Sequence, residues 1–60
     1  MTKSESKQVD MARSAIRMGE VGMAARTVSA LYRAGSRKTQ AELLSIAAEL
    51  SLTGHPDFKI

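Results

Sequence analysis

The chain has 60 residues, a formal net charge of +3 at pH 7 and no cysteine. A chain of this length forms one small domain, residues 1–60, whose limited core is often completed by a partner subunit. The lack of cysteine excludes disulfide bonds, thiolate metal sites and thiol catalysis.

The cellular location is predicted from two features that we do not find in the sequence, a membrane span and a secretory signal. No apolar run approaches the roughly 18 residues of a membrane span. The start of the chain, MTKSESKQVD, is polar and has no apolar segment of a secretory signal. We therefore expect a soluble, cytoplasmic protein. Its positive charge permits an acidic partner but does not require one.

The first predicted helix lies before Gly19. Thr2 and Glu5 have the spacing of a capping box, in which each side chain bonds the backbone of the other residue at the helix start. The apolar or small residues that follow at helical spacing are Val9, Ala12, Ala15, Ile16 and Gly19. Because these positions form one stripe, the segment is predicted to be an amphipathic helix.

A second helix is predicted between a break at Gly19 and Gly22 and a stop at Gly35. Its apolar face consists of Val21, Ala24, Ala25, Val28, Leu31 and Tyr32. The part from 24 to 33 resembles the recognition helix of some DNA-binding repressors. The side chains that would then face outward are Arg26, Thr27, Ser29 and Arg33. Against this interpretation, the preceding helix of such a motif would have to contain Gly19.

A third helix is predicted to begin at Thr39, which has capping-box spacing to Glu42, and to run to Gly54, with Pro56 preventing continuation. Its apolar arc spans about 160° at 100° per residue. One neighbouring helix cannot cover so wide an arc. Either this helix is the central one of a three-helix core, or part of its arc forms a dimer seam, and we expect both.

The end of this helix raises the question of DNA binding again. The stretch IAAELSLT, residues 46–53, resembles the first helix of a helix-turn-helix. The recognition helix would then be GHPDFKI, which contains Pro56 and has only seven residues. A recognition helix needs two to three turns to present several side chains to the major groove. We therefore exclude a helix-turn-helix at this end of the chain.

A basic window separates Glu20 from Glu42. It contains no acid and carries Arg26, Arg33, Arg37 and Lys38. Such a window indicates either phosphate contacts or an acidic protein partner. If the second and third helices form an antiparallel hairpin, however, Arg33 lies level with Glu42 and Arg26 with Glu49. We expect these pairs, and hence a partly neutralised, solvated face, in preference to a nucleic-acid footprint.

Residues with catalytic or metal-binding chemistry are sparse. His55 is the only histidine, and one imidazole without a second histidine or a cysteine cannot build a zinc site. The sequence contains neither a glycine-rich phosphate loop nor a nucleophile motif. We expect no enzyme activity, catalytic residue, cofactor, metal or small-molecule substrate.

The final segment alternates in polarity, with Phe58 and Ile60 apolar and Asp57 and Lys59 charged. Two interpretations remain. Phe58 either folds back over the open end of the core or belongs to a short peptide that binds the groove or sheet edge of a partner.

These patterns predict an all-α fold. We expect a small three-helix bundle, made of a helical hairpin and an N-terminal helix, that associates as a homodimer. Residues 1–4 are expected to be a flexible N-terminus and residues 55–60 a C-terminal tail.

The predicted function is that of a small non-catalytic accessory or regulatory protein, of a size that suits a bacterial, plasmid or phage factor. It is expected to bind another protein and itself, without a membrane. The residues expected on the partner or dimer surface are Leu43, Leu44, Ile46, Leu50 and Phe58. The alternative is a DNA-binding regulator that reads DNA with helix 24–33. The contacts to nucleic acid or an acidic partner would then come from Arg26, Ser29, Arg33, Arg37 and Lys38.

Overall fold

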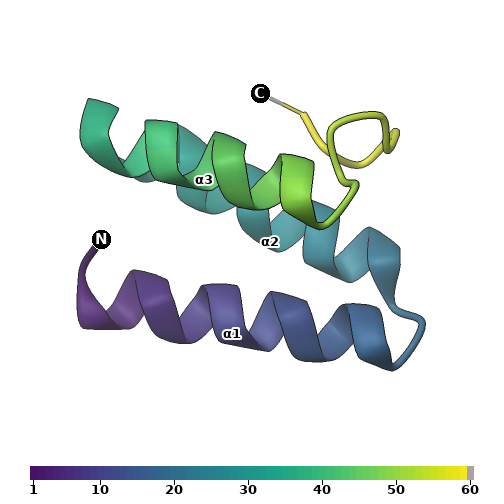
Figure 1. Ribbon diagram of the computed structural model, residues 1–60. Coiled ribbons are helices and arrows are strands. Elements are labelled where there is room, and N and C mark those ends of the chain that lie inside the picture. The colour runs from purple at the N-terminus through teal and green to yellow at the C-terminus, as the bar shows by residue number, and fades with distance from the viewer. Residues whose placement is uncertain (60) are drawn as a thin grey trace.

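Three α-helices make up most of the computed structural model, which describes residues 1–59 (Figure 1). They are α1 (Lys3–Arg17), α2 (Val21–Ala34) and α3 (Arg37–Glu49). The described residues contain no β-strand. The prediction of an all-helical fold with three helices is confirmed. The part of the tail prediction that concerns Ile60 lies outside the described residues.

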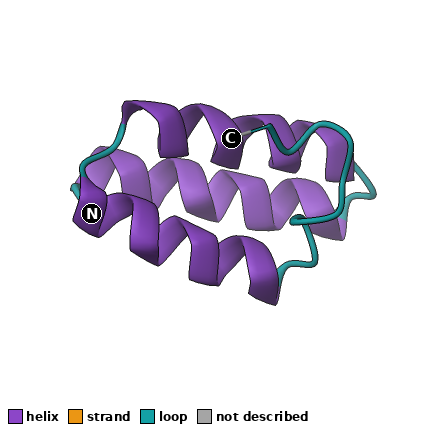
Figure 2. Cartoon of the chain, turned by 90° about the horizontal axis from the view of Figure 1, so that it is seen from above, coloured by secondary structure: helices purple, strands orange, loops and turns teal. Residues whose placement is uncertain are grey.

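The helix at the centre of the fold is α2. It packs against both of the other helices, whereas no Cα atom of α1 lies within 8 Å of one in α3. Figure 2 shows the three helices side by side, with the loops at their ends. The prediction that the third helix is central was wrong. Its wide apolar arc is only partly used, because Leu44 on that arc is 40% exposed.

The capping box predicted at the start of α1 is present. The Glu5 backbone N–H donates to Thr2 Oγ1 at 3.2 Å, and the Thr2 N–H donates to Glu5 Oε1 at 2.8 Å. Residues 1–4, where we expected a flexible terminus, therefore contain the capping residue Thr2 and the first two residues of the helix. The amino group of Met1 also forms an ion pair with Glu42 at 3.4 Å.

The predicted break at Gly19 ends α1. Gly19 has a φ of +83°, a left-handed conformation that is readily adopted by glycine. The Gly19 N–H donates to the Ile16 carbonyl at 3.0 Å, and the Glu20 N–H donates to the Ala15 carbonyl at 2.8 Å. These two bonds form a Schellman motif. The other predicted breaker, Gly22, lies inside the first turn of α2.

The predicted bounds of α3 were wrong at both ends. Its N-cap is Ser36, whose Oγ accepts from the Thr39 N–H at 3.3 Å, so Thr39 lies within the first turn. At the other end the helix stops at Glu49. Ser51 has a φ of +58° and takes the position that Gly19 takes after α1. The Leu52 N–H donates to the Ala47 carbonyl at 2.8 Å, as a second Schellman motif requires.

The core is small because many of its side chains are. Its buried apolar residues are Val9, Ala12, Ala15, Ala24, Ala25, Val28, Leu31, Leu43, Ala47, Leu52 and Phe58. Five of these eleven are alanines, which let the helix backbones approach closely but bury little apolar area each. A core of this kind supplies little stability to spare.

The tail after α3 folds back on the core. Leu52 is fully buried and Phe58 is 9% exposed, so Phe58 covers the core, as the first of our two interpretations proposed. The Lys59 N–H donates to Ser29 Oγ at 2.9 Å, and this hydroxyl donates to the Ala25 carbonyl at 2.8 Å. Ser29 is therefore buried between α2 and the tail, which contradicts its predicted outward-facing position.

Candidate functional site

Most of the residues that we predicted on the partner or dimer surface are buried or half-buried in the core. Leu43 is fully buried, and Phe58 folds back with the tail onto the core. Ile46 and Leu50 are half-buried against the core, so Leu44 alone of the five predicted residues is exposed.

The ion pairs that we predicted across the α2–α3 hairpin are replaced by others. Arg26 Nη1 lies 3.0 Å from Asp57 Oδ2 in the tail. Glu49 Oε1 lies 3.3 Å from Arg13 Nη1 in α1, while Glu42 pairs with the amino terminus. The prediction considered only the two helices of the hairpin, whereas the amino terminus, α1 and the tail supply these partners.

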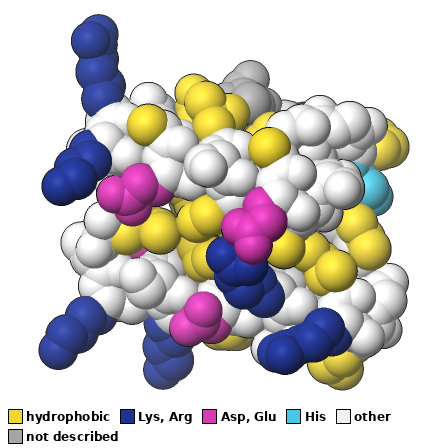
Figure 3. All heavy atoms as spheres, viewed as in Figure 1, with side chains coloured by type: hydrophobic (Ala, Val, Ile, Leu, Met, Phe, Trp, Pro, Cys, Tyr) yellow, Lys and Arg dark blue, Asp and Glu magenta, His cyan; other side chains and the backbone are white. Residues whose placement is uncertain are grey.

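Three of the predicted basic contacts stay on the surface. Arg33, Arg37 and Lys38 are exposed near the α2–α3 turn, and within residues 1–59 none of them forms an ion pair. Figure 3 shows basic side chains projecting from the periphery of one face, with apolar side chains between α1 and α3. Of the predicted nucleic-acid contacts, Ser29 is therefore buried and Arg26 forms an ion pair with Asp57.

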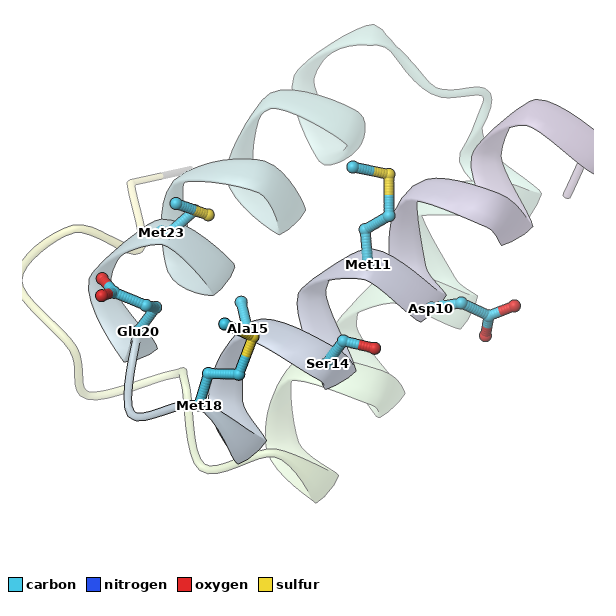
Figure 4. A pocket seen from close by; sticks show the side chains of 7 residues that line it. All are labelled: Asp10, Met11, Ser14, Ala15, Met18, Glu20 and Met23. Atoms are coloured by element: carbon cyan, nitrogen blue, oxygen red, sulfur yellow. The ribbon is translucent and has the colours of Figure 1, made fainter.

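The most exposed large apolar side chains lie elsewhere, on α1, at its end and on α2. Met18 is 78% exposed, Met11 62% and Met23 51%. Figure 4 shows Met11 and Met23 reaching toward the space between α1 and α2, with Ala15 between them. Ala15 is 7% exposed and forms the floor of this space. Because its side chain is only a methyl group, it leaves room above the floor.

These side chains line a hollow of about 360 Å³, which we call the methionine groove. Its lining residues are Asp10, Met11, Ser14, Ala15, Met18, Glu20 and Met23. A further hollow of about 380 Å³ shares Met11, Ala15 and Met23 and continues along the helix junction. The groove therefore follows the seam between α1 and α2.

The ends of the methionine groove carry negative charge. Of the six acids in the chain, Glu5 caps α1, and Glu42, Glu49 and Asp57 form ion pairs. The remaining two, Asp10 and Glu20, form no ion pair within residues 1–59, and both line the groove. Figure 4 shows them at opposite ends of it.

A charged stripe runs along α1 beside the methionines. Asp10, Ser14 and Arg17 follow one another at spacings of four and three residues, so they share one face of the helix. Arg17 Nη2 donates to Ser14 Oγ at 3.1 Å. All three line a hollow of about 390 Å³ that borders the methionine groove through Asp10 and Ser14.

The groove combines an apolar lining with charged ends. Thioether and methyl groups cover its walls and floor, and carboxylates stand at its ends. Among residues 1–59, no three histidine, cysteine or acidic side chains gather in a position to hold a metal ion. None of the three helices combines the length and the apolarity needed to span a membrane.

The sequence analysis missed this site, although a signal was present. Met11, Ala15 and Met18 have the four-and-three spacing of an apolar stripe. This stripe lies beside the core stripe of Val9 and Ala12, and the small core has no room for both.

Neither a family model, nor a curated protein, nor a solved structure matches this chain. Its function is therefore inferred from its own residues.

Proposed function

We propose that this chain is a small, non-catalytic protein that acts by binding a protein partner through the methionine groove. The observation that carries the proposal is the exposure of Met11, Met18 and Met23 around one hollow. Methionine is enriched at protein interfaces, and its flexible thioether side chain adapts to the surface that it meets. A cytoplasmic location suits a chain that has no cysteine to form disulfide bonds.

Charge supports a protein partner over DNA for this groove. Phosphate groups would be repelled by Asp10 and Glu20, whose carboxylates stand at the groove ends. The exposed basic residues Arg33, Arg37 and Lys38 lie near the α2–α3 turn, outside the lining of the groove. Nucleic acid at that turn is the competing function, and the experiment must separate the two.

Photo-crosslinking from single positions provides the test. A photoreactive side chain replaces Met18 in one variant and Lys38 in a matched control, because both positions are exposed and they lie at different helix ends. Both proteins are irradiated in lysate of the native host, with and without nuclease. We expect a nuclease-resistant protein adduct from position 18, suppressed by excess unlabelled protein, and no such adduct from position 38.

The opposite pattern would contradict the proposal. A nuclease-sensitive adduct from position 38, with none from position 18, would assign the chain to nucleic-acid binding at the α2–α3 turn. Circular dichroism of both variants confirms that each retains its helices before crosslinking.

A further inference from the structure

We infer that the occupant of the methionine groove is a second copy of this chain, with the two α1 helices packed antiparallel across a two-fold axis near Ser14. This inference rests on the proposed function and names its partner.

The apolar stripe of α1 matches itself when reversed. Met11 and Met18 stand on either side of Ala15, with Ser14 beside it. In an antiparallel pair centred on Ser14, Met11 lies within about one residue rise, 1.5 Å, of the level of the second copy's Met18. The small Ser14 and Ala15 then meet at the crossing point. Small residues there allow the two helices to approach closely.

The charged stripe selects the antiparallel direction. A two-fold axis that lies between the helices and runs across them keeps the Asp10–Ser14–Arg17 stripes on the same side of the seam. Asp10 of each chain then faces Arg17 of the other, which gives two equivalent ion pairs. A parallel pair would place these stripes on opposite sides, and neither charge would meet its complement.

Both groups are available for this pairing. Within residues 1–59, Asp10 and Arg17 form no ion pair, although the other acids apart from Glu20 are engaged by a cap or a cation. The hydrogen bond of Arg17 to Ser14 holds the guanidinium along the charged stripe. An acidic groove end alone would favour a basic partner of any sequence. In this chain, however, Arg17 lies almost as far from Ser14 along α1 as Asp10 does on the other side, so it comes opposite Asp10 of the second copy.

The area that a stable dimer needs is a modest share of the surface of this chain. Small stable interfaces bury about 1,200 Å² in total, or about 600 Å² from each partner. This amounts to about 15% of the 3946 Å² accessible surface of the chain. The face includes α1 and the Met23 side of α2, on a molecule that measures 28 × 21 × 16 Å. The alanine-rich core gives such a chain much to gain from this burial.

Charge reversal and sedimentation equilibrium test the pairing. In Asp10→Arg, two arginines face each other across the seam, and in Arg17→Asp two aspartates do. Each single variant is therefore expected to weaken the dimer about tenfold or more at low salt. An equimolar mixture of the two variants restores both ion pairs in a heterodimer, and so does the double variant in a homodimer. Arg33→Asp makes the same charge change outside the groove and leaves the dimer intact.

Two results would overturn the inference. One is a monomer mass for the unaltered chain up to about 100 µM, and the other is a dimer that the mixture and the double variant fail to restore. A monomer that still yields a crosslink from position 18 to a different protein ends the second-copy inference alone. A dimer unaffected by Met18→Glu, without any crosslink from position 18, ends the proposed function as well.

Discussion

At the scale of single residues, the exposed methionines are the feature that most needs a physical explanation. Lysine, glutamate or glutamine would form the helix equally well and would be better solvated. Met11, Met18 and Met23 instead expose half or more of their surface. Covering a large apolar side chain is worth roughly 1.5–3 kcal/mol. A partner that covers all three on this face therefore gains a favourable contribution to its binding free energy.

The capping box at the start of α1 affects the pKa of Glu5. The hydrogen bond from the Thr2 backbone N–H to its carboxylate lowers the pKa of Glu5 below its usual value. A folded-state pKa below the unfolded value stabilises the fold above the unfolded pKa, about 4.3. This contribution is lost as the pH falls through the folded-state pKa.

We expect Glu5→Gln to remove this pH dependence, because the amide keeps an acceptor oxygen but does not titrate. The free energy of unfolding, measured in urea between about pH 6 and about pH 3, should fall less steeply for the variant than for the unaltered chain. Glu20→Gln serves as the control, since Glu20 makes no side-chain hydrogen bond at the start of α2. Equal slopes for Glu5→Gln and the unaltered chain would contradict a lowered pKa of Glu5 in the folded chain.

At the scale of the helices, the sequence predicted what local rules determine. The capping box of Thr2 and Glu5 was found because both side chains act within one turn. The stop at Gly35 was found because the apolar periodicity ends there. The end of α3 was missed because a helix break was expected at glycine, whereas the chain places Ser51 in the left-handed position.

The burial of Leu52 explains why Ser51, a residue other than glycine, adopts the left-handed conformation after α3. A left-handed conformation costs a residue other than glycine roughly 1–2 kcal/mol. Burying a leucine is worth roughly 1.5–3 kcal/mol, and Leu52 is fully buried as a direct result of the turn at Ser51. The burial thus offsets the strain. Local sequence rules do not include this term, because it depends on where the core lies.

We therefore expect Ser51→Gly to stabilise the protein. Relief of the left-handed strain outweighs the greater entropy of glycine in the unfolded chain, for a net gain of about 0.5–1 kcal/mol. Urea unfolding measures the change. Gly54→Ala is the matched control, because Gly54 has open space around its Cβ position and no left-handed φ, so a change within about 0.5 kcal/mol is expected. A loss of stability in Ser51→Gly would refute this account of the helix end.

At the scale of the whole molecule, the missed features are those that join distant segments. Local sequence patterns do not predict that Arg13 pairs with Glu49 or that Asp57 reaches Arg26. Those contacts depend on how α1 and the tail lie against the hairpin. The methionine groove also arises only when α1 and α2 pack, because its walls come from both helices.

The most direct measurement of whether a protein chain covers the methionine groove is oxidation of its methionines by dilute hydrogen peroxide, read by mass spectrometry. It compares the chain at high dilution in buffer with the same chain added at about 100 µM to lysate of its native host, so that a second copy or another protein can cover the groove. Met1, retained in the protein used, is the reference, because it lies outside the groove lining. We expect oxidation of Met11, Met18 and Met23 relative to Met1 to slow by about tenfold in the lysate, as burial blocks the thioethers. Unchanged relative rates would contradict the account and leave the groove open to solvent.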